Sequence, residues 1–117
     1  MTDRDPDCLF CRIVADEIPS DRVYEDDEVI AFRDINPRAP THLLVIPRRH
    51  IPDAHSLTDA DAAILAKLFA VMRSLAEDAG LGTGYRVVTN VGPDAGQSVP
   101  HLHFHLLGGR TMTWPPG

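Results

Sequence analysis

The chain has 117 residues, the size of one ordinary domain, and we expect a single domain over residues 1–117. Its 17 Asp and Glu residues outnumber its 11 Lys and Arg residues, and this net charge of −6 argues against polymeric nucleic acid as a partner. No apolar run is long enough to cross a bilayer, so we expect a cytoplasmic protein that has no membrane partner.

The predicted elements follow a polar N-terminal segment, residues 1–7, which we expect to be flexible. Five segments rich in β-branched and other apolar residues are predicted as strands, at residues 23–25, 29–32, 42–47, 85–91 and 99–107. Residues 58–79 carry apolar side chains at three- and four-residue steps, which predicts a long amphipathic helix. Together these elements predict an α+β domain in which the helix packs on an antiparallel sheet.

Both ends of the predicted helix carry local signals. Thr58 and Asp61 have the spacing of a capping box, in which each side chain accepts a hydrogen bond from the other residue's backbone N–H. Gly80 follows the last apolar residue, where helices commonly end with a residue in the left-handed conformation.

Three histidines, His101, His103 and His105, alternate with apolar residues near the C-terminus. Alternate side chains of a strand share one face, so the three imidazoles would form a row that is difficult to explain as packing. The row is either a metal site or a catalytic centre with a nucleophile between two assisting groups. The preceding loop, residues 90–98, favours catalysis, because its glycines let backbone N–H groups converge on an anion and Ser98 adds a hydroxyl.

The segment His101–Leu107 resembles the histidine triad signature, and the similarity extends over nearly the whole chain after residue 8. The other matching segments are Glu17-Ile18-Pro19, residues 32–35, residues 39–47, Gly96-Gln97-Ser98 and Trp114-Pro115-Pro116-Gly117. The combination is similar to the nucleotide-binding Hint branch of the histidine triad (HIT) superfamily. This resemblance implies the HIT-like α+β fold, with an antiparallel sheet of about five strands, one long helix, a short N-terminal helix and a sheet extended across a dimer.

The resemblance further implies a purine nucleotide-binding hydrolase that cleaves the P–N bonds of nucleoside 5′-phosphoramidates. His103 would attack the α-phosphorus and form a nucleotidyl-histidine, which water then hydrolyses. His105 and Ser98 would contact the phosphate and help to protonate the leaving amine. His42 would donate into the triad, and His101 would orient the nucleophile through a backbone carbonyl. A neutral imidazole is a competent nucleophile near pH 7, provided that an acceptor fixes its second nitrogen.

The same resemblance implies a binding site for purine nucleoside monophosphates and phosphoramidates. By motif position, Asp34 accepts hydrogen bonds from the ribose hydroxyls, and Asn90 lies near the phosphate and ribose. The other expected nucleotide-binding residues are Phe10, Ile13, Phe32 and Ile35, which would enclose the base, and Gly96, Gln97, Ser98, His103 and His105.

Cys8 and Cys11 form a C-x-x-C pair, which in a cytosolic chain is typical of a redox pair or of half a zinc site. Superfamily members complete such a site with a downstream histidine and the first histidine of the triad, here His50 and His101. The resemblance therefore implies a structural Zn²⁺ that holds the N-terminal segment against the triad and takes no part in the transfer. Two unligated thiols are the alternative, and no thioredoxin-like βαβ pattern supports a redox function.

The resemblance also implies a homodimer in which Trp114, in the C-terminal tail at residues 108–117, lies near the partner's active site. Two alternative functions remain open. The first is a dinucleoside polyphosphate hydrolase or nucleotidylyl transferase, although these enzymes typically carry glutamine where this chain has His105. The second is a nucleotide-binding scaffold whose catalysis is incidental.

Overall fold

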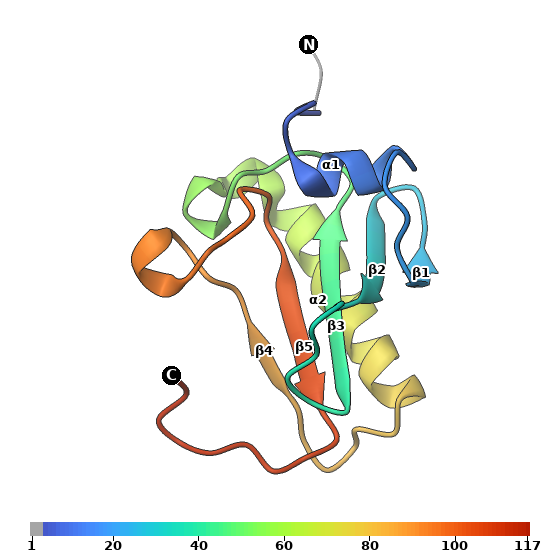
Figure 1. The fold of residues 1–117 in the computed structure, drawn as a ribbon, viewed down its shortest axis with the longest axis vertical. Helices are drawn as coiled ribbons and strands as arrows, with labels where there is room; N and C mark the ends of the chain where they lie inside the picture. The colour runs from blue at the N-terminus through green and yellow to red at the C-terminus, as the bar shows by residue number, and fades with distance from the viewer. Residues whose placement is uncertain (1–3) are drawn as a thin grey trace.

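A five-stranded antiparallel sheet organises the chain, and the computed structural model describes residues 4–117. The strand order is β1-β2-β3-β5-β4 (Figure 1). The strands are β1 (Arg22–Glu25), β2 (Val29–Arg33), β3 (Thr41–Pro47), β4 (Arg86–Val88) and β5 (Phe104–Gly108). Within the described range the helices are α1 (Leu9–Val14) and α2 (Ala62–Asp78), with 3₁₀ turns at Ala54–Ser56, Asp59–Asp61 and Pro93–Ala95. The predicted α+β fold, with its short N-terminal helix, is confirmed.

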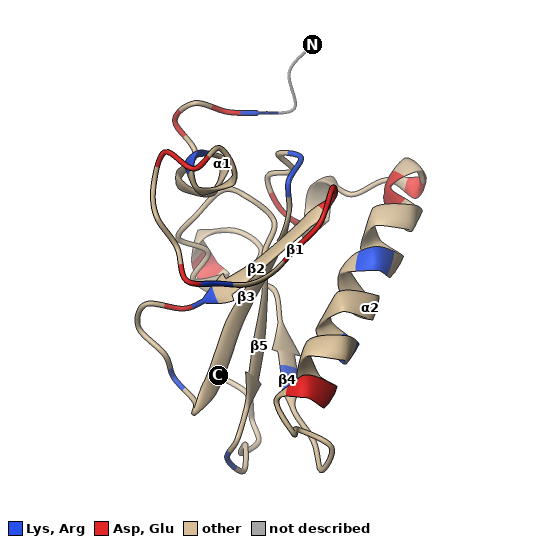
Figure 2. Cartoon of the chain, turned by 90° about the vertical axis from the view of Figure 1, so that its right-hand side faces the viewer, with Lys and Arg blue, Asp and Glu red and all other residues tan. Residues whose placement is uncertain are grey.

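Helix α2 covers one face of the sheet (Figure 2), because its apolar stripe and one set of alternating strand residues form a single core. Leu68 and Met72 on α2 and Val45 and Leu106 on the central strands are each at most 1% exposed. Burial of each such side chain contributes roughly 1.5–3 kcal/mol. Neither α2 nor any other helix in the described part of the chain combines the length and apolarity needed to cross a membrane.

The signals predicted at the helix ends are both present. Thr58 and Asp61 form the capping box, although the first turn, Asp59–Asp61, is 3₁₀ and the α-helix begins at Ala62. At the other end Gly80 has a φ of 72°, and the Leu81 N–H donates to the Ala76 carbonyl at 2.9 Å. This 6→1 hydrogen bond defines a Schellman motif, which ends the helix.

Helix α1 packs against the opposite face of the sheet (Figure 2). The side chains of β2 and β3 alternate between the two sides. Ile30 and Ile46 face α1, whereas Ala31 and Val45 face the α2 core. The sheet is therefore buried on both faces here, which explains why these strands read as continuous apolar runs.

The last strand is shorter than the predicted residues 99–107, because it begins only at Phe104. Just before it, the Leu102 N–H donates to the Ile51 carbonyl at 2.6 Å and the Thr89 hydroxyl donates to the His103 carbonyl at 2.8 Å. Loop and side-chain partners thus replace the sheet ladder upstream of Phe104.

The fourth strand is also shorter than the predicted residues 85–91, since β4 is confined to Arg86–Val88. Its pairing with β5 ends where Val88 meets His105. β5 extends only one residue beyond this pair, so β4 has almost no further partner backbone on that side.

The N-terminal segment predicted to be flexible spans residues 1–7, of which residues 1–3 lie outside the described residues. Over residues 4–7 the structure shows specific contacts. The Cys8 N–H donates to the Asp5 carbonyl at 3.0 Å, and Arg4 forms an ion pair with Glu17. These contacts connect the start of the described chain to α1 and to the loop that follows it.

Candidate active site

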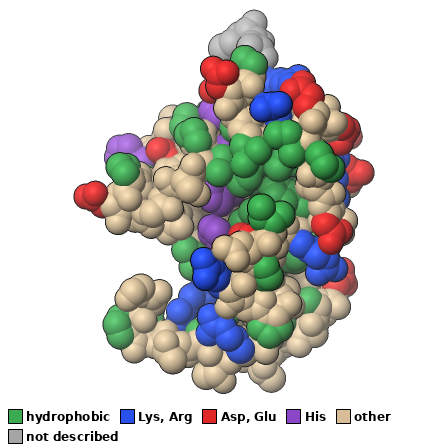
Figure 3. Space-filling model, viewed as in Figure 1, with side chains coloured by type: hydrophobic (Ala, Val, Ile, Leu, Met, Phe, Trp, Pro, Cys, Tyr) green, Lys and Arg blue, Asp and Glu red, His purple; other side chains and the backbone are tan. Residues whose placement is uncertain are grey.

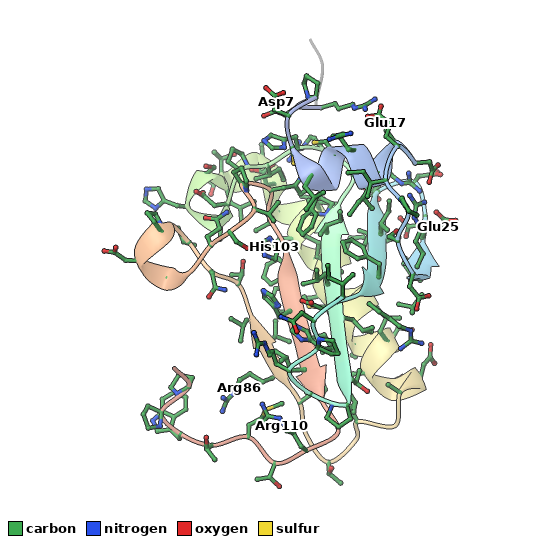
Figure 4. The ribbon with its side chains drawn as sticks, viewed as in Figure 1. Asp7, Glu17, Glu25, Arg86, His103 and Arg110 are labelled. Atoms are coloured by element: carbon green, nitrogen blue, oxygen red, sulfur yellow. The ribbon has the colours of Figure 1, made fainter. Side chains whose placement is uncertain are left out.

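The histidine row lies on the face of the sheet opposite α2, where histidine side chains border a hydrophobic surface (Figure 3). His105 is within β5, whereas His101 and His103 precede the strand. The alternation nevertheless continues through the irregular segment, because the intervening residues Leu102 and Phe104 belong to the α2 core. His103 lies at the start of β5 (Figure 4), and its side chain and that of His101 are buried.

His103 is held by the backbone of its own segment. Its Nδ1 lies 2.7 Å from the His101 carbonyl oxygen. A carbonyl can only accept, so His103 carries its proton on Nδ1 and donates it there. In the neutral tautomer that this contact selects, the lone pair is on Nε2, which is the arrangement required of a nucleophile.

A second chain of hydrogen bonds runs from the backbone to His105. The Arg38 N–H donates to His42 Nδ1 at 3.0 Å, so His42 must carry its proton on Nε2. That Nε2–H donates to His105 Nδ1, which lies 2.9 Å away. His105 in turn carries its proton on Nε2, where it is available as a donor to a ligand.

Burial keeps this pair of imidazoles neutral. It lowers the pKa of His42, although the nearby Asp34 carboxylate opposes the shift. Burial also lowers the pKa of His105 to about 4, and the positive charges that His103 and His42 would carry act in the same direction. Near neutral pH both side chains therefore act as hydrogen-bond donors and acceptors, not as cations.

Asp34 lies beside these histidines at the end of β2. Its Oδ2 is 3.4 Å from His42 Nε2, and its Oδ1 accepts a hydrogen bond from the Asn36 N–H at 2.8 Å. Asp34, His42 and His105 could together hold a metal ion by distance alone. The direct hydrogen bond between the two imidazoles already accounts for their arrangement, so nothing in their geometry calls for a metal.

Four side chains gather on the other side of His101, with their ligand atoms within 4.8 Å of one another: Cys8, Cys11, His50 and His101. His101 Nδ1 lies 3.4 Å from Cys8 Sγ and 3.5 Å from Cys11 Sγ, and His50 Nδ1 lies 3.2 Å from Cys11 Sγ. Tetrahedral Zn²⁺ separates a thiolate and an imidazole ligand by about 3.5 Å. The distances therefore fit a closed Cys₂His₂ site.

The groups that surround these four side chains also fit a metal site. His101 Nε2 donates to the Pro47 carbonyl at 2.9 Å, which fixes the proton there and leaves the Nδ1 lone pair directed at the two sulfurs. Burial raises the pKa of the Cys8 thiol to about 11, so a buried thiolate at this position needs a partner charge. The donor set thus matches the chemistry of Zn²⁺.

Comparison with known proteins places this arrangement in a family. Residues 15–112 match the HIT domain family. The chain belongs to this family. A HIT-like protein of Synechococcus elongatus is 50% identical over 111 residues, which cover 95% of this chain and 97% of the relative. The 14 kDa zinc-binding protein of Zea mays is 50% identical over 115 residues, which cover 97% of this chain and 90% of the relative.

Solved structures share the same HIT fold. A HIT family hydrolase from Legionella pneumophila superposes with a TM-score of 0.93 at 52% identity, covering 95% of this chain and all of that chain (100%). A HIT family hydrolase from Clostridium thermocellum has a TM-score of 0.90 at 46% identity, covering 93% of this chain and 96% of that one. The superfamily and fold expected from the resemblance are confirmed, and the Hint branch stays a prediction.

Three of the residues expected to enclose the base come together on the α1 side of the sheet. Phe10, Ile13 and Phe32 are buried in one cluster under α1, with the Phe10 and Phe32 rings 5.5 Å apart. Phe10 also packs its ring edge-to-face with His103, at a centroid separation of 5.1 Å. Ile35 does not join this cluster, because it is fully exposed in the turn after β2.

The glycine-containing loop before the triad is braced from within. Gln97 Oε1 accepts from the Gly92 N–H at 2.8 Å, and Gln97 Nε2 donates to the Pro52 carbonyl at 2.9 Å. Gly96 has a φ of 86°, which a glycine adopts without strain. Of the other residues expected here, Ser98 is exposed and Asn90 is half-buried. The Gln97 side chain therefore shapes the loop, and its part in binding a nucleotide stays a prediction.

The C-terminal tail begins at the opposite end of β5 from His103 (Figure 4). The Arg86 guanidinium donates to the Thr113 carbonyl at 2.9 Å, and Trp114 is 81% exposed. A hollow of about 570 Å³ lies here, with Arg86 and Arg110 among its lining residues. Within one chain, this hollow lies at the opposite end of β5 from His103, whereas the tail contacts the loop beside His42, where Arg110 Nε donates to the Arg38 carbonyl at 3.2 Å.

The groups that set the tautomers of the histidines could not be predicted from the sequence. The Arg38 N–H and the Pro47 carbonyl each fix the tautomer of one imidazole. Thr89 fixes the backbone of the nucleophile segment through the His103 carbonyl. Backbone donors and acceptors are present at nearly every residue, so no sequence signal distinguishes the ones that are used.

Proposed function

We propose that this HIT domain hydrolyses nucleoside 5′-phosphoramidates at the P–N bond, through a nucleotidyl intermediate on His103. The observation that carries the proposal is the 2.7 Å hydrogen bond from His103 Nδ1 to the His101 carbonyl. In the neutral ring this hydrogen bond holds the proton on Nδ1, so that the lone pair is on Nε2. The neutral state of the neighbouring imidazoles supports nucleophilic chemistry near neutral pH.

In the first step, His103 Nε2 attacks the α-phosphorus, and the bond from phosphorus to the leaving nitrogen breaks. The amine must be protonated as it leaves, and His105 Nε2–H and the Ser98 hydroxyl are the proposed donors. The donation from His42 to His105 keeps that proton on the outer nitrogen of His105. Water then attacks the phosphorus of the intermediate, the bond from phosphorus to His103 Nε2 breaks, and the proton released by the water returns to the group that protonated the amine.

The nucleotide is held by groups around the triad. We expect Asp34 to accept hydrogen bonds from the ribose hydroxyls, and Asn90 to contact the ribose and phosphate. The base would lie against the apolar cluster of Phe10, Ile13 and Phe32, and the exposed Ile35 would have to close over it. The Ser98 backbone N–H would stabilise the phosphoryl oxygens, because the N–H groups of Gly96 and Gln97 already donate to the carbonyls of Pro93 and Gly92.

Zn²⁺ is proposed at Cys8, Cys11, His50 and His101. Support comes from the distances within the cluster, the orientation of His101 and the zinc-binding relative from Zea mays. Bound there, Zn²⁺ supplies a closed structural site that ties α1 to the segment carrying the triad. All four positions are then occupied by protein ligands, so these residues leave no place for an activated water.

We also propose a homodimer that extends the sheet through β4. β4 lies at the end of the strand order, so one of its edges has no partner strand within the described chain. Tyr85 and Val91, which flank this strand, are 42% and 40% exposed. A second copy at this edge would bring the tail with Trp114 close to the partner's histidines.

The decisive test of the reaction compares an adenosine phosphoramidate with a dinucleoside polyphosphate as substrate. We expect the wild type to prefer the phosphoramidate, and His103→Ala to lose at least about 1,000-fold in kcat/KM. His55→Ala, at an exposed histidine outside the triad, is the matched control and should retain activity. Faster turnover of the polyphosphate would favour the alternative hydrolase, and AMP binding without turnover of either substrate would favour a scaffold.

A further inference from the structure

His101 belongs both to the metal-binding cluster and to the proposed catalytic centre. Its side-chain Nδ1 lies 3.4 Å from Cys8 Sγ, and its backbone carbonyl accepts the hydrogen bond from His103 at 2.7 Å. The residue is completely buried, at 0% exposure. Its side chain therefore cannot exchange a lost partner for bulk water without moving, and a move shifts the carbonyl that orients His103.

Phe10 provides a second connection between the same two places. It lies between Cys8 and Cys11 in the first turn of α1. Its ring packs edge-to-face on His103 at 5.1 Å and on His101 at 5.9 Å. Any rearrangement of the two cysteines therefore moves a ring that contacts the nucleophile directly.

We propose that the Cys8–Cys11 pair is a thiol switch that controls the position of His103. In the reduced state, both sulfurs and His101 hold the metal, and the nucleophile is oriented. Oxidation of the pair to a disulfide releases the metal and disorders His103, so that hydrolysis slows. This inference rests on the proposed function and on Zn²⁺ at the cluster.

The oxidation balances with a peroxide as the oxidant. Each thiolate loses one electron and the two sulfurs form one S–S bond. Hydrogen peroxide accepts the two electrons, takes up two protons and leaves as two molecules of water. The metal ion departs as Zn²⁺ and does not change its oxidation state.

The geometry of the cluster makes the metal-bound state and the disulfide state mutually exclusive. Both sulfurs lie within 4.8 Å of each other and of the histidine nitrogens, as four ligands of one ion require. A disulfide needs the sulfurs about 2.05 Å apart, so at least one must leave its place beside His101. The C-x-x-C spacing on one helical turn permits this bond, as it does in disulfide oxidoreductases.

The test follows His103 by NMR in the full chain loaded with Zn²⁺, using the imidazole ¹⁵N signals that His103→Ala assigns. Peroxide is added while released Zn²⁺ and free thiols are measured. We expect two thiols and one Zn²⁺ to be lost together, the His103 signals to shift, and kcat/KM to fall about tenfold or more. A reductant and Zn²⁺ added together should restore all of these.

Two variants control the experiment. Cys8→Ser/Cys11→Ser should show the shifted His103 signals before peroxide is added and no response to it, whereas His55→Ala should behave as the wild type. Loss of Zn²⁺ and thiols with unchanged His103 signals would overturn the proposal, as would thiols that survive excess peroxide. Absence of turnover in the loaded protein would count against the proposed function alone, because the NMR response is measured without substrate.

Discussion

His105 is kept neutral by its surroundings, and this has a consequence for stability. Burial and the neighbouring imidazoles lower its pKa to about 4, whereas the ordinary value is about 6.5. As the pH falls, the unfolded chain therefore takes up this proton before the folded chain does. The contribution of His105 to stability is present above about pH 6.5 and is lost progressively towards about pH 4.

We predict that His105→Gln flattens the acid side of the stability profile. The variant lacks the group that binds a proton only on unfolding, so its free energy of unfolding should fall less than that of the wild type between about pH 6.5 and about pH 4.5. Urea unfolding at several pH values measures this difference. Parallel profiles for the two proteins would show that His105 is not held neutral, and His55→Gln, at an exposed position, serves as the control.

For individual residues, the sequence predicted well which side chains form the site, but it did not predict their hydrogen-bond partners. The alternation of histidine and apolar residues placed the triad on one face, although His101 and His103 lie outside the strand. What distinguishes their roles is the partner of each ring, namely the Pro47 carbonyl for His101 and the His101 carbonyl for His103. These partners depend on where the backbone passes, which side-chain patterns do not encode.

Helix α2 depends at its C-terminal end on one residue with a left-handed backbone. We predict that Gly80→Ala lowers the free energy of unfolding by about 1 kcal/mol, because its φ of 72° is costly for any residue with a Cβ. No atom lies within 4 Å of the added methyl group, so the cost comes from the backbone alone.

Gly82→Ala is the matched control for that element. Its added methyl group also meets nothing within 4 Å, but its backbone is not left-handed. We expect it to be neutral or to stabilise the protein by up to about 1 kcal/mol, since it reduces the freedom of the unfolded chain. Urea unfolding of both variants compares them, and equal effects would contradict the Schellman assignment.

Elements with local end signals were predicted more closely than elements without them. The capping box at Thr58 is close in sequence to the backbone groups that it satisfies, and so is Gly80 at the other end. Both helix ends could therefore be predicted from local sequence. Strand ends depend on a distant partner strand. β4 and β5 are each shorter than their apolar runs, because the ladder between them ends near Val88 and His105.

At the scale of the whole molecule, the Cys/His cluster and the histidine triad are brought together by contacts between residues that are distant in sequence. Cys8 meets His101 across a separation of 93 residues, so no local pattern predicts the pair. Spacing alone left a redox pair and a zinc half-site open for Cys8 and Cys11. The resemblance to the superfamily named His50 and His101 as partners, and the fold brings all four side chains within reach of one ion.

The proposed homodimer can be tested through the mass of the protein in solution. We predict that sedimentation equilibrium gives twice the chain mass of 12.9 kDa, and that replacing Tyr85 and Val91 with lysine shifts the protein towards the monomer. Leu9→Lys, at an exposed apolar residue on α1, should leave the mass unchanged. A monomeric wild type would contradict the proposed extension of the sheet through β4.

The central claim is that His103 forms a covalent bond to the nucleotide, and intact-mass spectrometry of acid-quenched reactions tests it most directly. Wild-type protein mixed with an adenosine phosphoramidate should gain the mass of one nucleotidyl group during turnover, with the modified peptide containing His103. His103→Ala should gain nothing. Turnover of the wild type with no trapped intermediate at any quench time, or an unchanged gain in the variant, would contradict the account.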